Sequence, residues 1–97
     1  MFPLREKIQQ QREEIIQVAG QHRAVNVRLF GSVARGEESE VSDIDMLVDF
    51  LPGASLLDQV ALMQDLSDQL KRQVDVVSTR ALNPHLREDI LKEAIQI

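Results

Sequence analysis

A Gly-Ser pair and an Asp-x-Asp motif, each joined to a short apolar segment, constrain the fold of this chain more than any other feature. The first apolar segment ends at Gly31-Ser32, and ten residues later Asp43 and Asp45 open a second apolar segment. Because side chains on a strand alternate between its two faces, the two aspartates point to the same side. Two strands therefore bring a glycine turn and two carboxylates into one small region.

The residue types at these positions favour phosphate and metal chemistry. Two unpaired carboxylates repel each other, and Mg²⁺ relieves the repulsion because carboxylate and phosphate oxygens suit this cation. Gly31 lets the backbone approach a ligand closely, and the turn into a predicted short helix, Val33–Arg35, offers N–H groups to a phosphate. The alternatives are a surface turn at Asp43 and Asp45, and an ordinary helix N-cap at Ser32. The joint spacing favours phosphoryl or nucleotidyl transfer.

A third aspartate lies inside another apolar segment. Asp75 is the only charged residue in the core of the predicted strand 73–78, and an unpaired carboxylate is costly to bury. If this strand lies parallel to the second one, Asp75 can lie beside Asp43 and Asp45, and three carboxylates can hold two Mg²⁺ ions. Asp75 would then be a shared metal ligand or the general base for an attacking hydroxyl. The alternative is a structural aspartate at a strand end.

The apolar periodicity predicts a small α/β (α+β) fold, with residues 1–97 as a single domain. For Gly31 and Asp43 to meet one phosphate, the first two strands must run antiparallel, and the helix between the second and third strands favours a parallel, right-handed crossover. The result is a mixed sheet of three strands, or slightly more, flanked by helices. The predicted elements are a helix through Leu4, Ile8, Ile15 and Ala19 that ends at Gly20, strands 26–30, 44–50 and 73–78, a helix with an apolar stripe from Leu56 to Leu70, and a final helix from Asn83-Pro84 to Ile95.

Composition excludes several classes of protein. With a formal charge of −5, the chain lacks the basic surface on which broad nucleic-acid binding depends, so we expect no direct nucleic-acid partner. It contains no cysteine, which excludes disulfides and thiolate metal sites. No apolar run is long enough to span a bilayer, and the N-terminus lacks the apolar core of a signal peptide. We therefore expect a cytoplasmic protein with no membrane contact.

The pattern of Gly-Ser, ten residues and Asp-x-Asp resembles that of the DNA polymerase β-like nucleotidyltransferases. In so short a chain it is similar to the minimal nucleotidyltransferases that act as antitoxins in HEPN–MNT toxin–antitoxin pairs, and the resemblance covers nearly the whole chain. It implies that Gly31 and Ser32 hold the triphosphate of ATP and that Asp43, Asp45 and Asp75 bind magnesium and form the catalytic triad. It further implies transfer of AMP from ATP to a tyrosine of a HEPN-family RNase toxin, which silences the toxin.

Arg35 and Ser42 are further candidate nucleotide-binding residues. Arg35 could contact a phosphate or a partner, or it could pair with a carboxylate such as Asp49 and brace the loop. Asp49 itself fits a strand-end or salt-bridge residue. The loop between the two motifs carries three acidic residues that fit either a solvated loop or a surface facing a basic partner: Glu37, Glu38 and Glu40.

Two other functions are compatible with these residues. A binding-only antitoxin would block its toxin by contact, but three clustered carboxylates are unfavourable without a metal. A small-molecule nucleotidyltransferase of the aminoglycoside type usually needs a second domain to hold its acceptor, and 97 residues predict only one domain. The sequence therefore favours nucleotidyl transfer, and the resemblance implies a protein partner as the acceptor.

Overall fold

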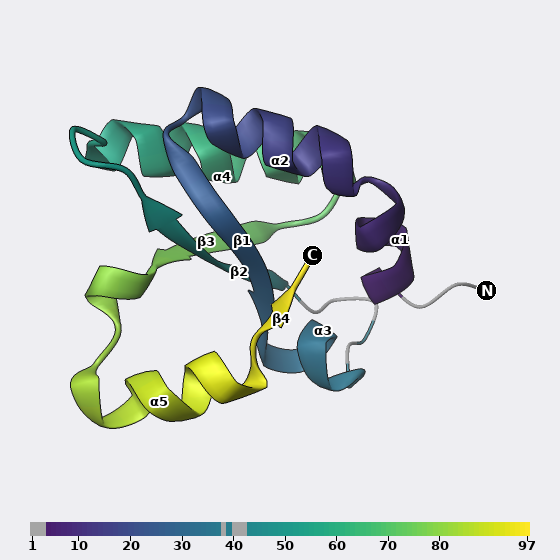
Figure 1. The fold of residues 1–97 in the computed structure, drawn as a ribbon. Helices are drawn as coiled ribbons and strands as arrows, with labels where there is room; N and C mark the ends of the chain where they lie inside the picture. Colours follow the sequence, from purple (N-terminus) through teal and green to yellow (C-terminus); the bar gives the residue numbers. More distant parts are fainter. Residues whose placement is uncertain (1–3, 38, 40–42) are drawn as a thin grey trace.

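The computed structural model describes residues 4–37, 39 and 43–97, and a sheet with helices on both sides organises them (Figure 1). Its helices and strands, in chain order, are α1 (Leu4–Gln10), α2 (Arg12–Gln21), β1 (Ala24–Phe30), α3 (Gly31–Arg35), β2 (Ile44–Phe50), α4 (Leu56–Leu70), β3 (Val74–Ser78), the 3₁₀ helix η1 (Thr79–Ala81), α5 (Pro84–Glu93) and β4 (Ile95–Gln96). Across these described ranges, no helix combines the length and apolar character needed to cross a bilayer.

The strands form one mixed sheet in the order β3-β2-β1-β4. β2 runs antiparallel to β1 and parallel to β3, with α4 connecting β2 to β3. This is the arrangement predicted from the need to bring Gly31 and Asp43 together and from the helical crossover. The sheet has four strands rather than three, because a short strand follows α5.

The fourth strand replaces the end of the predicted final helix. The α5 helix ends at Glu93, and its C-cap Ala94 is extended, with φ −64° and ψ 140°. Ile95 then pairs with Leu29 of β1. The expectation that Ile95 is helical is wrong, because pairing with a strand distant in sequence overrides the local helical pattern. β4 also covers part of the β1 edge, where backbone N–H and C=O groups would otherwise lack partners.

The sheet has one fully buried face and one face that carries the acidic residues. Leu29, Met46 and Val76 lie in register across β1, β2 and β3, and all three are almost inaccessible to solvent. On their side α2 packs on β1 and α4 packs on β3 (Figure 1). Because neighbouring residues alternate between faces, Asp45 points to the opposite side of the sheet, where Figure 1 shows α5.

The N-terminal segment forms two helices instead of the single predicted helix. The apolar residues predicted to share a face, Ile8, Ile15 and Ala19, are buried in the core as expected. Gly20 does not end the helix, because its backbone stays helical within the last turn of α2. The left-handed residue beyond the helix is Arg23, with φ 61°.

Local signals at the starts of α4 and α5 are confirmed. Ser55 and Asp58 form the predicted capping box, in which the Ser55 N–H donates to the Asp58 carboxylate at 2.9 Å. The side chain of Asn83 accepts a hydrogen bond from the N–H of His85 at 2.9 Å, with Pro84 in the first turn. These bonds satisfy N–H groups that have no partner within the helix, and they fix where each helix begins.

The apolar stripe of α4 begins later than predicted. Leu56 and Leu57 are 72% and 79% exposed, whereas the buried residues of this helix are Leu62 and Leu66. The first turn of α4 is therefore exposed, and the residues that this helix buries lie in its later turns.

Candidate active site

The turn from β1 into α3 places the backbone directly against a motif carboxylate. Gly31 has φ +73°, a left-handed conformation that favours glycine, and a Cβ atom at this position would overlap Asp45 Oδ2 and lie 3.3 Å from Asp45 Cγ. Ser32 follows in α3 and is half-buried. Any larger residue at position 31 would displace the Asp45 carboxylate, so the close approach of the turn to the Asp-x-Asp motif depends on glycine.

Asp45 and Asp75 lie side by side on neighbouring strands. They are paired in register in the parallel β2–β3 ladder, and neighbouring strands of a sheet are about 4.8 Å apart. On its other side, Asp45 is paired with Phe30, the residue before Gly31. Phe30, Asp45 and Asp75 therefore form one row across the sheet, and this row ends at the turn that begins α3.

Asp45 and Asp75, which we call the acidic row, and the nearby Asp43 interact electrostatically. Burial is the largest cause that raises the pKa of Asp45 above its ordinary value, and the negative charges of Asp75 and Asp43 raise it further. The positive charge of Arg35 lowers the same pKa but does not offset the other causes. Asp45 is thus a half-buried carboxylate with like charges close by, and such an environment stabilises a bound cation.

The aspartates do not by themselves form a closed metal centre. Within residues 4–37, 39 and 43–97, no group of three or more His, Cys, Asp or Glu side chains is arranged to hold a metal ion. The residues nevertheless fit Mg²⁺ in their chemistry, because Asp45 and Asp75 are adjacent carboxylates. Burial and then the neighbouring negative charges raise the pKa of Asp45, and a cation would neutralise those charges. Asp43 is exposed, and it directly follows residues 40–42, which lie outside the described ranges. Magnesium binding by the three aspartates stays a prediction.

Arg35 is held by two carboxylates. Its Nε donates to Glu37 at 2.9 Å and its Nη1 donates to Glu93 at 2.5 Å, which links α3 to α5. The expected pairing of Arg35 with a carboxylate is confirmed. Asp49 is not the partner, because α3 follows the C-terminal end of β1 whereas Asp49 pairs with Val25 near the other end. The Arg35 side chain is 46% exposed, so a contact with a phosphate stays a prediction. Three predicted site or loop residues lie outside the described part of the chain: Glu38, Glu40 and Ser42.

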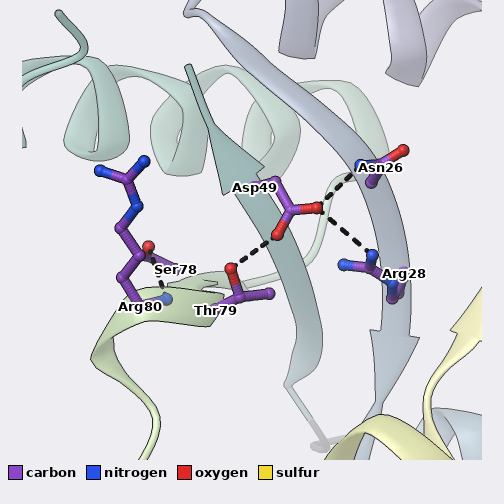
Figure 2. Close-up of polar contacts among 6 residues, drawn as sticks. All are labelled: Asn26, Arg28, Asp49, Ser78, Thr79 and Arg80. Atoms are coloured by element: carbon purple, nitrogen blue, oxygen red, sulfur yellow. Dashed lines mark hydrogen bonds and ion pairs between the residues drawn. The ribbon is translucent and has the colours of Figure 1, made fainter. Parts of the chain in front are cut away.

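A second polar cluster lies on the same face of β2, centred on Asp49 (Figure 2). The Asp49 carboxylate accepts hydrogen bonds from Asn26 at 2.8 Å, Arg28 at 3.3 Å and Thr79 at 2.6 Å. The predicted salt-bridge role of Asp49 is confirmed by its ion pair with Arg28. Sequence reasoning named none of the three donors. The even spacing of Asp49 from Asp45 points to a shared face, but no local signal identifies partners on β1 and η1.

Comparison with known proteins agrees with this geometry. Residues 13–97 match the family described as Polymerase beta, Nucleotidyltransferase, and the match includes the Gly-Ser turn and all three aspartates. The chain belongs to this family. A protein of Methanocaldococcus jannaschii named as a candidate protein adenylyltransferase is 41% identical over 86 residues, which cover 89% of this chain and 92% of that protein. The protein adenylyltransferase MntA of Thermococcus cleftensis is 37% identical over 71 residues, covering 73% of this chain and 72% of that protein.

Solved structures show the same nucleotidyltransferase fold. A structure described as a candidate minimal nucleotidyltransferase matches with a TM-score of 0.87 and 47% identity, covering 96% of this chain and 95% of that one. A crystal structure of a toxin–antitoxin with AMP-PNP matches with a TM-score of 0.74 and 26% identity, covering 87% of this chain and 69% of that chain. The acidic row and the Gly31 turn therefore lie in a nucleotidyltransferase enzyme fold.

Proposed function

We propose that this nucleotidyltransferase is a Mg²⁺-dependent protein adenylyltransferase that transfers AMP from ATP to a tyrosine of a HEPN-family toxin in the cytoplasm, and so acts as an antitoxin. The observation that carries the proposal is the contact of the Gly31 backbone with Asp45, with Asp75 paired beside it. A phosphate-binding turn next to carboxylates on two neighbouring strands suits nucleotidyl transfer. The names of the relatives and the AMP-PNP in the toxin–antitoxin structure support ATP as donor and a protein as acceptor.

Each residue of the site has a task in this proposal. Backbone N–H groups of the turn and the Ser32 side chain bind the triphosphate. The three aspartates hold the metal, which when bound activates the attacking hydroxyl and neutralises charge on the leaving pyrophosphate. The tyrosine oxygen forms a bond to the α-phosphorus while the bond from that phosphorus to the pyrophosphate oxygen breaks in line. Asp75 either completes the metal site or accepts the hydroxyl proton. Arg35 and Ser42 are additional nucleotide contacts in this proposal.

Intact-mass measurement tests the proposal and its alternatives. The chain is incubated with ATP, Mg²⁺ and a HEPN-family protein, and the partner should gain one or more AMP units. Tight binding to the partner without a change in mass would favour a binding-only antitoxin. Efficient adenylation of free small molecules without any partner would favour an enzyme of the aminoglycoside type.

A double substitution tests which residues carry the reaction. Asp43→Ala with Asp45→Ala should lower AMP transfer at least about a hundredfold, because a bound metal stabilises the transition state by several kcal/mol. The free energy of unfolding in metal-free buffer should stay the same or rise, since the change removes repulsion. The control is Asp68→Ala with Asp89→Ala, which removes two exposed carboxylates from α4 and α5. Transfer at the wild-type rate by the Asp43/Asp45 variant would refute the metal assignment.

A further inference from the structure

Asp49 connects the three parts of the chain that carry the site, at a position remote from the site itself. The phosphate-binding turn follows β1, Asp45 lies on β2 and Asp75 lies on β3. Figure 2 shows donors from β1 and from η1, directly after β3, converging on the Asp49 carboxylate. One side chain of β2 thus bonds to β1 on one side and to Thr79, the residue directly after β3, on the other.

On the β3 side, Thr79 extends the ladder by one residue. The last backbone pair between β2 and β3 joins Val48 to Ser78, and the next residues, Asp49 and Thr79, are joined by a side-chain hydrogen bond of 2.6 Å from Oγ1 to Oδ1. Thr79 is only 8% exposed. A slip of one residue in this ladder would turn Asp75 to the opposite face of the sheet. The buried hydroxyl therefore opposes a slip that would remove Asp75 from the acidic row.

On the β1 side, Asp49 lies opposite a bulge. Val25 pairs with Asp49 and Arg28 pairs with Leu47, so β1 contains one more residue than β2 between these two pairs. Within the bulge, Asn26 has a left-handed backbone, with φ 55°. The side chains of Asn26 and Arg28 both donate to Asp49 Oδ2. Where backbone pairing is interrupted, these two bonds fix how far β1 advances along β2.

The charges within the cluster fit a fixed carboxylate. Burial is the largest influence on the pKa of Asp49 and raises it, but the hydrogen bonds from Thr79, Asn26 and Arg28 together hold this pKa below its ordinary value. Asp49 is therefore stabilised in its ionised form, as an acceptor for all three donors. Arg28 Nη1 is buried with no hydrogen-bond partner among the described residues. Within the described part of the chain, the bond from Arg28 Nη2 to Asp49 is the ion pair that this guanidinium makes.

We propose that Asp49 is a positioning residue for nucleotidyl transfer: with its three donors it holds the register of β1 and β3 against β2, and so sets the spacing between the Gly31 turn and the carboxylates of Asp45 and Asp75. The spacing matters because the triphosphate contacts the turn and the metal-bearing carboxylates at the same time. A misplacement of about 1 Å can cost about a hundredfold in rate. This inference rests on the proposed function.

The test uses the affinity of the full chain for ATP, measured with and without Mg²⁺. Without metal, ATP contacts the turn alone; with metal, it also engages the aspartates, so the gain in affinity on adding Mg²⁺ reports how well the two parts are aligned. Thr79→Val keeps the shape of the side chain but removes the hydroxyl, and should reduce this gain by about tenfold. Thr79→Ser keeps the hydroxyl and should retain the gain. The rate of AMP transfer at saturating ATP should follow the same order.

Two further variants separate positioning from general stability. Asn26→Gly tolerates the left-handed backbone but removes the amide donor, so it should also reduce the Mg²⁺-linked gain. If Thr79→Val does not fold, the Mg²⁺-linked gain of Asn26→Gly decides whether the cluster positions the site. Asp65→Asn is the matched control, because Asp65 accepts a 2.7 Å hydrogen bond from His22, which joins α4 to the residue directly after α2, away from the site. It should leave the gain unchanged, even if it lowers the melting temperature.

The outcomes distinguish this inference from the proposed function. If the wild-type chain shows no Mg²⁺-linked gain in ATP affinity, the proposed function is wrong and the inference is wrong with it. If the wild type shows the gain and both Thr79→Val and Asn26→Gly retain it in full, the positioning role of Asp49 is refuted while the proposed function stands. Loss of the gain in Thr79→Val but not in Thr79→Ser supports the positioning role.

Discussion

Two aspartates on one face of β2 have opposite environments, and this difference separates a candidate site residue from a structural residue. Asp45 has burial and two like charges that raise its pKa, with one arginine opposing them. Asp49 has three donors that outweigh its burial and lower its pKa. A carboxylate destabilised by its surroundings is one that a metal or ligand can stabilise, whereas a carboxylate already satisfied by hydrogen bonds contributes to the fold.

The stability of Asp45→Asn should reveal this difference. The raised pKa of Asp45 means that ionisation opposes folding, so the metal-free variant should be more stable than the wild type at pH 7. The gain should be about 0.2–1 kcal/mol, the size of a cross-strand charge pair. It should disappear as the pH falls below the ordinary aspartate value of 3.8, where both states are protonated. Urea unfolding at several pH values measures the effect.

Asp49→Asn provides the comparison with the opposite sign. Its lowered pKa means that ionisation favours folding, so the variant should be less stable than the wild type at pH 7. This deficit should shrink as the pH falls through the lowered pKa of Asp49. A loss of stability in metal-free Asp45→Asn at pH 7 would contradict the electrostatic account of the acidic row.

At the scale of helices and strands, the sequence predicts well where the signal is local. The capping box at Ser55 and the Asn83-Pro84 start depend on residues within one turn, and both are present. The strand at Ile95 and the bulge at Asn26 depend on pairing between distant segments, and the sequence shows neither. Local periodicity cannot report a hydrogen bond whose partner lies far away in the chain.

Contacts between α4 and β3 are another feature that the periodicity does not show. Ser67 Oγ accepts a hydrogen bond from the N–H of Val74 at 2.9 Å, and Gln59 Nε2 donates to the carbonyl oxygen of Val76 at 2.7 Å. β3 is an edge strand of the sheet. Side chains of α4 therefore satisfy backbone groups that could otherwise pair with another strand.

Ser67→Ala should weaken this edge. The change leaves the N–H of Val74 without its acceptor in a residue that is fully buried, so unfolding should become easier by about 1–3 kcal/mol. Gln64→Ala is the control, because Gln64 is exposed on the same helix and its side chain makes no hydrogen bond with the described residues; its effect should stay within about 0.5 kcal/mol. Equal stability of the two variants, measured by urea unfolding, would show that this edge bond contributes nothing.

At the scale of the whole molecule, the candidate site is assembled from three elements separated along the chain. The sequence identifies Gly31 and the Asp-x-Asp motif because their types and spacing are distinctive, and parallel pairing places Asp75 beside Asp45. It does not identify the carboxylates that hold Arg35, because Glu93 reaches α3 from the far end of the chain. It also does not identify the Asp49 cluster, whose donors come from β1 and from η1.

The proposed reaction also needs a second protein to complete the site. The chain has no Trp or Tyr to stack against adenine, and its helices and strands serve one core. We therefore expect the acceptor and part of the nucleotide to be held by the partner. A basic partner would be drawn to the acidic loop that contains Glu37, Glu38 and Glu40, because complementary charge mainly accelerates association.

Charge reversal tests this attraction. Replacing Glu37, Glu38 and Glu40 by lysine should slow association with a basic HEPN-family partner by about tenfold at low salt, and the deficit should shrink as salt shortens the screening length from about 10 Å at 0.1 M to about 3 Å at 1 M. The control replaces Glu13, Glu14 and Asp68 by lysine. These three residues lie on α2 and α4, on the opposite side of the sheet from α5 (Figure 1). Both variants change the net charge equally. If the control slows association as much as the loop variant, net charge alone governs the encounter and the acidic loop is not the docking surface.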